Sequence, residues 1–98
     1  MRHITIGYLR PEKERFIGNI INANNTLGAL SHYFKVVNLR IDFKNFDFRK
    51  LEDLDIDYLL PDINDFGPMQ FILRERHRIN IPFMIILRTV YAWTEPLV

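Results

Sequence analysis

The sequence contains no cysteine and only four glycines in 98 residues. Without cysteine the chain cannot form disulfides, a thiol nucleophile or a thiolate metal site, and this composition is typical of a cytoplasmic protein. The glycines are too sparse for a phosphate-binding turn, because no further glycine follows Gly7 until Gly18. The G-x-G-x-x-G and P-loop spacings, and the nucleotide-binding functions they indicate, are therefore excluded.

An excess of charge of one sign is also missing. Thirteen basic and twelve acidic residues give a formal net charge of +1, so no strong field attracts nucleic acid, and we expect no nucleic-acid partner. The chain has no run near the ~20 apolar residues that a membrane span requires. Its first residues, "MRHITIGYL", are too short for a signal peptide. We expect no transmembrane segment, and a protein that is either free in the cytoplasm or peripheral at a membrane.

The composition is that of a folded globular domain. Hydrophobic residues make up 48% of the chain and charged residues 26%, and no tract rich in proline, glycine and serine suggests disorder. A chain of this length forms one domain at most. We therefore treat residues 1–98 as a single domain with a thin core.

The first half of the chain predicts a strand, a helix and a second strand. Residues 3–9, "HITIGYL", form an apolar, β-rich run that ends at the charged stretch "RPEKER". Residues 35–42 alternate apolar and polar side chains, as a half-buried strand does. Between them an amphipathic helix is predicted from steps of four and three residues between apolar positions, which are Phe16, Ile20, Ala23, Leu27, Leu30 and Phe34.

The second half repeats the alternation. A short helix is predicted near residues 48–53, and a third strand in "IDYLLPDIN" stops at Pro61, because proline cannot donate to a central ladder. Asp65 is a plausible N-cap for a second long helix, with Pro68 in its first turn. Its apolar side is predicted from Met69, Ile72, Leu73 and Ile79. Residues 81–87, "IPFMIIL", predict a fourth strand that is buried on both faces.

This order predicts an α/β fold, a Rossmann-like parallel sheet with flanking helices, because alternating strands and helices form right-handed βαβ units. A helix is also expected after the fourth strand to cover it. The chain instead continues as "TVYAWTEPLV". We therefore expect the domain to be truncated, and we expect self-association through the exposed tail around Trp93.

Metal-binding and kinase motifs are not supported. "DINDFG" resembles the start of a calcium-binding EF-hand loop, but Leu73 stands where a bidentate glutamate is required. The triplet "DFG" lacks the other kinase motifs. His3, His32 and His77 lie on different predicted elements, with no i, i+4 pair, so no metal site is expected.

Ligands of open α/β sheets bind outside the carboxyl ends of the strands. Three segments follow these ends here: Tyr8–Arg15 together with Gly18, Asp62–Gly67, and Arg88–Trp93. We expect the three segments to converge on one cleft rim.

The order of segments resembles the N-terminal domain of a GT-B glycosyltransferase of the retaining class called family 4 or group 1. "GYLRPEKERFIGNIINANNTLGALSHYFKVVNL" follows the family's course of strand, loop and long helix. "IDYLLPDINDFGPMQFILRERHRINIPFMIILRTVY" matches its later strand, loop, helix and "GIP" strand, with "INIPFMIIL" in the last position. The resemblance covers nearly the whole chain.

The resemblance implies the acceptor-side part of an enzyme that transfers a sugar from a nucleotide-sugar donor to a glycan or lipid acceptor. The family's donor site lies mainly in a C-terminal domain, whose E-x7-E pattern is absent here. We therefore expect no cofactor in this chain, a nucleotide-sugar donor for the full-length protein, and no turnover by these 98 residues alone. The catalytic residues stay unknown.

Two departures from the family limit what is carried over. The family's His-Asp pair after the fourth strand is replaced by Arg88 and Thr89, so the role of that histidine is not carried over. The paired glycines of the first loop are reduced to Gly18 with Asn19, so the loop contact is not carried over either.

Four residues are the candidate substrate-binding residues. Gly18 can let a ligand approach the backbone, Asn19 and Asp65 can hydrogen-bond sugar hydroxyls, and Arg88 can meet an anionic group. The competing interpretation is helix capping for Asn19 and Asp65 and a surface ion pair for Arg88.

A different function also stays open, namely a small standalone α/β regulatory or protein-binding module without catalytic activity. A receiver domain of that kind needs an acidic cluster after its first strand, and "YLRPEKER" stands there.

Overall fold

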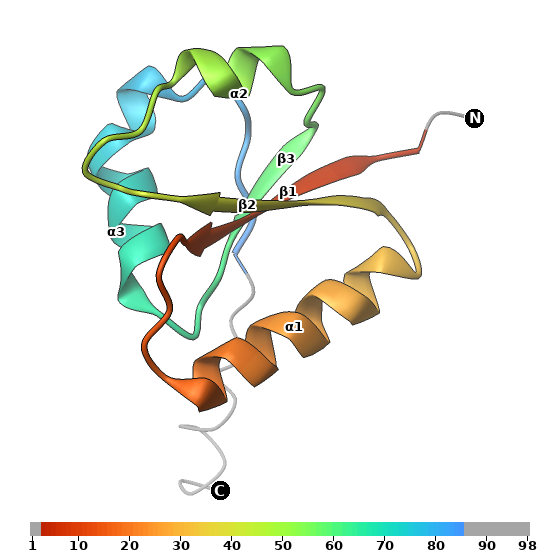
Figure 1. The fold of residues 1–98 in the computed structure, drawn as a ribbon. Coiled ribbons are helices and arrows are strands. Elements are labelled where there is room, and N and C mark those ends of the chain that lie inside the picture. The colour runs from red at the N-terminus through yellow and green to blue at the C-terminus, as the bar shows by residue number, and fades with distance from the viewer. Residues whose placement is uncertain (1–2, 86–98) are drawn as a thin grey trace, which may run out of the picture.

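The computed structural model describes residues 3–85, which form a small parallel sheet with helices on both sides (Figure 1). Three strands lie in the order β2-β1-β3, and both pairings are parallel. The elements along the chain are β1 (Thr5–Pro11), α1 (Ile17–Ser31), β2 (Lys35–Ile41), α2 (Arg49–Asp53), β3 (Tyr58–Pro61), α3 (Phe66–Glu75) and the short 3-10 helix η1 (Arg76–Arg78).

The strand order explains why the helices cover opposite faces of the sheet. The chain steps from β1 to β2 in one direction, and from β2 back past β1 to β3 in the other. Helix α1 lies on one face and α2 and α3 lie on the other (Figure 1). The right-handed rule for the two crossovers accounts for the opposite positions of α1 and α2. We call these faces the α1 face and the α3 face. The predicted α/β, Rossmann-like class is confirmed.

The α3 face holds an apolar core with a cluster of aromatic rings. Leu9 of β1 packs with Ile41, Phe71 and Ile72. Around Phe71 lie three further rings whose centroids are 5.1, 5.7 and 5.8 Å from its own, and they belong to Phe43, Phe46 and Phe48. The loop after β2 thus contributes core residues although it has no regular structure.

The apolar part of the α1 face is smaller. Ile6 and Tyr8 of β1, Ala23 of α1 and Leu60 of β3 form its buried centre. The partly buried residues around them come from α1, from the turn after it and from β2, and they are Leu27, Leu30, Phe34 and Val36. Most of the predicted stripe of α1 is therefore confirmed, but Phe16 precedes the helix and is exposed.

Gly7 lies where the central strand is most closely covered. A Cβ atom at this position would lie 2.9 Å from Cδ1 of Ile56 and 2.9 Å from Cδ1 of Leu39. The side chains on the α3 face have filled the space that any larger residue would need. This close packing explains a glycine in the middle of a buried strand.

Two predictions about apolar faces are corrected. The buried residues of α3 are Pro68, Phe71 and Ile72, whereas Leu73 is 49% exposed. The phase of the helix is set by how it contacts Leu9 and the phenylalanine cluster, and spacing within the helix does not reveal it. In the second case, residues 83–85 were expected to be buried on both faces, but they are exposed and belong to none of the apolar clusters.

The segment after η1 nevertheless extends the sheet. Phe83 forms a parallel bridge with Leu59, and the two backbone hydrogen bonds that flank it, Leu59 N–H to Pro82 O and Met84 N–H to Leu59 O, are both 2.8 Å long. The predicted fourth strand is thus represented within residues 3–85 by a single bridge beside β3. Residues 86–98, which include the rest of the predicted strand, Arg88 and the tail around Trp93, lie outside the described residues.

Candidate functional site

Charged and polar side chains occupy the carboxyl end of β1 on the α1 face. Arg10 follows Ile6 and Tyr8 at intervals of two, so it points to the same face, and it is only 2% exposed. Its guanidinium donates from Nη1 to Oδ1 of Asn24 in α1 (3.0 Å) and from Nη2 to Oε1 of Glu14 (2.6 Å). A full positive charge is thus buried at the end of the central strand, where a partner of opposite charge is required.

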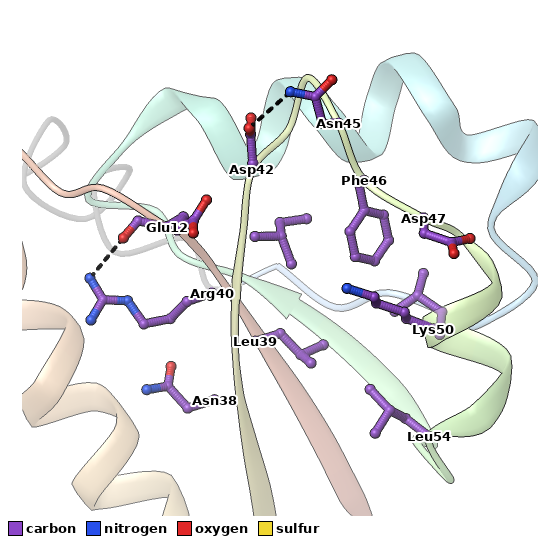
Figure 2. A pocket seen from close by; sticks show the side chains of 12 residues that line it. Glu12, Asn38, Leu39, Arg40, Asp42, Asn45, Phe46, Asp47, Lys50 and Leu54 are labelled. Carbon is purple, nitrogen blue, oxygen red and sulfur yellow. Dashed lines mark hydrogen bonds between the residues drawn. The ribbon is translucent and has the colours of Figure 1, made fainter.

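Glu14 is held by two arginines at once. Oε1 of Glu14 also lies 3.1 Å from Nη2 of Arg40, and its side chain is almost fully buried. Arg40 is the residue of β2 that stands beside Arg10 in the sheet register. Arg40 also donates to the carbonyl oxygen of Glu12 at 3.3 Å (Figure 2). These contacts fix the loop between β1 and α1 over the ends of the two strands.

A second polar group joins β1 to β3. Asp62, which follows β3, is fully buried, and its Oδ1 accepts from the Tyr8 hydroxyl at 2.9 Å. The side-chain amide and backbone N–H of Asn64 donate to the same oxygen, at 2.8 and 3.2 Å. Burial is the main cause that raises the pKa of Tyr8 above its ordinary value, and the Asp62 carboxylate raises it further. Tyr8 therefore stays a neutral hydrogen-bond donor to Asp62.

Two buried polar atoms of this region have no hydrogen-bond partner within residues 3–85. They are Nε of Arg10, a donor, and Oδ2 of Asp62, an acceptor. Buried polar atoms are nearly always paired, so this donor and this acceptor near one strand end are each able to take a further hydrogen-bond partner. A hydroxyl group satisfies either atom, since it can both donate and accept.

The strand order identifies the position where an open α/β sheet binds its ligand. The chain leaves β1 toward β2 on one side and reaches β3 on the other, so the topological switch point lies between β1 and β3. Asp62 N–H bonds to the carbonyl oxygen of Leu9 at 2.9 Å, which ties the two strand ends together. Two of the three segments expected at the rim therefore meet at this edge, and the third lies outside the described residues.

The predicted site residues differ in their surroundings. Gly18 and Asn19 lie in the first turn of α1; Gly18 is exposed, and a Cβ there would meet nothing within 4 Å. Close packing therefore does not explain why a glycine occupies position 18. Asp65 caps α3, because its Oδ1 accepts from the N–H of Gly67 at 2.9 Å. Arg88 lies outside the described residues.

Sequence reasoning missed Arg10 and Glu14 as individual residues of the site. The available signal was the two-residue period of β1, since Ile6, Tyr8 and Arg10 share one face. A charged residue on the buried face of a strand needs a partner, and Glu14 is the acidic residue four positions later. The burial of Glu14 itself depends on how the loop folds back, which local sequence does not specify.

Two hollows flank the carboxyl end of β2. One, of about 540 Å³, lies beyond the ends of β1 and β2 and is lined by Lys13, Arg15 and Lys44 as well as Glu12 and Asp42. The other, of about 430 Å³, follows the outer edge of β2 toward α2, with Leu39, Phe46 and Leu54 in its wall and Arg40 and Lys50 at its rim (Figure 2). Both volumes are in the range of small-molecule sites.

The described part of the chain gives no sign of a metal centre or of a membrane span. Within residues 3–85, histidine and acidic side chains nowhere gather in threes as ligands of a metal ion. The helices of the same residues lack the length and apolar character needed to cross a bilayer.

The chain matches no protein-family model, and neither the curated proteins nor the solved structures contain a significant match to it. The functional argument therefore rests on the fold and on the side chains at the carboxyl end of the sheet.

Proposed function

We propose that this chain is the acceptor-side part of a GT-B glycosyltransferase, which transfers a sugar from a nucleotide-sugar donor to a glycan or lipid acceptor. The observation that supports this proposal most directly is made at the junction of β1 and β3. There Arg10 and Asp62 each have one buried polar atom without a hydrogen-bond partner within residues 3–85. The resemblance of the segment order to the family N-terminal domain supports the same function.

The chemistry of this junction suits a polyhydroxylated ligand. Sugar hydroxyls need carboxylate acceptors and amide or guanidinium donors at fixed positions. Asp62, Asn64 and Arg10 supply these groups from β1 and from the end of β3, and their hydrogen bonds to Tyr8, Glu14 and Asn24 keep them in place. The site is thus preorganised, which reduces the entropic cost of binding.

In this proposal the chain binds and orients the acceptor. Positioning of the acceptor hydroxyl accelerates transfer because it turns an encounter between two substrates into a reaction within one complex. The groups that bind the donor and stabilise its leaving diphosphate belong to a second domain. The chain by itself is then a binding unit without turnover.

The regulatory alternative is less well supported in its receiver-like form. A receiver domain needs an aspartate that is open to phosphorylation at the end of a strand, and Asp62 is the residue in that position. Oδ1 of Asp62 already accepts three hydrogen bonds, which hold the carboxylate in one orientation. The residue after β1 that could assist it, Glu14, is occupied by two arginines.

Saturation-transfer NMR with the 98-residue chain tests the proposal. The probes are methyl and octyl glycosides of glucose, galactose and mannose, with free UDP-glucose as the donor probe. We expect at least one glycoside to bind, and its affinity to fall in Asn19→Ala. Asn25→Ala, an exposed asparagine of the same helix, is the control and should bind like the wild type. If no glycoside binds, or if UDP-glucose alone binds, the acceptor-side assignment is wrong.

A further inference from the structure

Two arginines stand side by side on neighbouring strands at the carboxyl end of the α1 face. Arg10 of β1 and Arg40 of β2 are register partners, and adjacent strands lie only about 4.8 Å apart. Two guanidinium groups in this position repel each other unless an anion lies between them. Glu14 supplies that anion, since its Oε1 is 2.6 Å from Arg10 and 3.1 Å from Arg40.

The single carboxylate of Glu14 does not pair with all the N–H donors of Arg10 and Arg40. A guanidinium carries five N–H donors, and Arg10 uses Nη1 for Asn24 and Nη2 for Glu14, which leaves Nε without a partner within residues 3–85. Arg40 is about half exposed and shares the same Glu14 oxygen. An anion with three or more oxygens can accept from both guanidinium groups more completely than Glu14 does.

The surroundings of the pair also favour an anion. The 540 Å³ hollow just beyond Pro11 and Ile41, the residues that follow the two arginines, has three basic residues in its lining, Lys13, Arg15 and Lys44, against two acidic ones, Glu12 and Asp42. Helix α1 begins at the same edge, and its first turn has neither a side-chain cap nor an acidic residue. Its free N–H groups therefore add a partial positive charge.

The loop that carries Glu14 is short and connects these features. It runs from Glu12 to Phe16, between β1 and α1, and Lys13 and Arg15 alternate in it with Glu14. The buried Glu14 thus holds the basic side chains of the loop beside the hollow. Replacement of Glu14 by a ligand would free the loop without leaving either arginine unpaired.

We propose that Arg10 and Arg40 form a binding site for the phosphoryl group of a small molecule, and that the Glu14 carboxylate occupies this site in the absence of the ligand. Arg10 borders both sites. Arg40 and Glu14 belong only to this one, on the β2 side of β1, whereas Asp62 and Asn64 belong only to the proposed acceptor site on its β3 side. The inference therefore does not depend on sugar transfer, and it holds for a regulatory module as well.

The test measures phosphate binding by isothermal titration calorimetry at fixed ionic strength, with orthophosphate, pyrophosphate and glucose 1-phosphate as probes. In Glu14→Gln the competing charge is gone while the shape is kept. We expect the affinity to rise about tenfold or more, which corresponds to about 1.4 kcal/mol. Glu14→Asp keeps the charge but moves it away from the arginines, and a smaller rise is expected. This second variant covers the case in which Glu14→Gln does not fold.

The opposite effect is expected for Arg40→Gln, which should lose phosphate binding while the fold is kept, since Arg40 is half exposed. Arg49→Gln is the matched control, because Arg49 is an exposed arginine whose ion pair with Asp47 lies at the surface. It should bind phosphate like the wild type. Stronger binding of glucose 1-phosphate than of orthophosphate identifies a phosphate ester as the ligand, and equal binding identifies free phosphate.

Two results would overturn the inference. The first is a Glu14→Gln or Glu14→Asp variant that is folded by circular dichroism but binds none of the probes more tightly than the wild type. The second is an Arg40→Gln variant that binds like Arg49→Gln. Either result would leave the Arg10–Glu14–Arg40 group as an ion pair that only fastens the loop.

Discussion

Consecutive residues of β1 meet opposite environments. Leu9 points to the α3 face and packs with Phe71 and Ile72 in a cluster of apolar side chains. Arg10 points to the α1 face, where Glu14 and Asn24 bind its guanidinium. The two side chains are both almost fully buried. Burial of Leu9 on the α3 face is thus explained by the hydrophobic effect, whereas burial of Arg10 at the carboxyl end of the α1 face requires a network of charges and hydrogen bonds.

The difference suggests a division of roles between the faces. A buried apolar core contributes to stability at every position, whereas a buried ion pair often contributes little compared with well-packed apolar residues. The charged groups are also concentrated at the carboxyl end of the strand, since Ile6 at the other end of the same face is in an apolar cluster. We infer that the α3 face stabilises the domain and that the carboxyl end of the α1 face binds ligands.

The largest loss of stability is expected from Phe71→Ala. Phe71 is buried among Phe43, Phe46 and Phe48, and deletion of such a ring costs about 3–5 kcal/mol. Phe66→Ala in the same helix is the control, because Phe66 is 84% exposed, and it should change the free energy of unfolding by less than about 0.5 kcal/mol. Urea denaturation measures both. Equal effects would contradict an apolar core on the α3 face.

A smaller but still large loss is expected from Arg10→Met. The substitution removes one partner of a buried ion pair and leaves Glu14 with Arg40 alone, which costs about 3 kcal/mol. The double variant Arg10→Met with Glu14→Gln should recover part of this loss, since no buried charge then stays poorly paired. Urea denaturation of both proteins shows the outcome. If the double variant loses more free energy of unfolding than the two single variants lose together, charge pairing does not hold the network.

Tyr8→Phe tests the polar junction of β1 and β3. At neutral pH the loss of the hydrogen bond to Asp62 should cost about 1–2 kcal/mol. The pKa of Tyr8 is raised in the folded state, so its contribution is complete below the unfolded pKa near 10 and is lost as the pH rises above it. The wild type should therefore lose stability above pH 10 more steeply than Tyr8→Phe does.

The matched control for this substitution is Tyr33→Phe, because Tyr33 is 80% exposed. The free energy of unfolding of Tyr33→Phe should fall with rising pH as steeply as that of the wild type. Unfolding curves between pH 8 and about 11, the range that spans the tyrosine pKa, provide the comparison. A wild-type slope in the Tyr8→Phe variant would mean that Tyr8 is not protected from ionisation.

The smallest effect is expected from Asp65→Ala, which removes the N-cap of α3 and should cost about 1 kcal/mol. Asp65→Ser keeps a capping oxygen and should restore most of the stability. The pair also separates the two interpretations of this residue. If glycoside binding is lost in Asp65→Ala and kept in Asp65→Ser, Asp65 acts through the helix cap, whereas loss in both variants indicates contact with the ligand.

The fold was predictable because its signals are local. The apolar, β-rich run of β1, the period of two in β2, the spacing of Ala23 and Leu27 in α1, and the cap at Asp65 each act within a few residues. The phase of α3 was not predictable, because the inward position of Phe71 depends on three rings from a distant loop.

The candidate site was predictable only as an edge of the sheet. The segments after β1 and β3 do meet there, because parallel strands end on the same side. Which side chains become buried at this edge depends on long-range pairing, such as that of Tyr8 with Asp62 and of Glu14 with Arg40. These pairs are formed only after the strands have assembled.

The central claim is that the carboxyl end of the α1 face binds a ligand and that the apolar core around Phe71 on the α3 face does not. The most direct measurement is a two-dimensional ¹H–¹⁵N NMR titration of the wild-type chain with octyl glycosides and with glucose 1-phosphate. The account predicts shifted amides in residues 12–19 and 62–65 and unchanged amides around Phe71. Shifts confined to the α3 face, or no shifts with either probe, would contradict it.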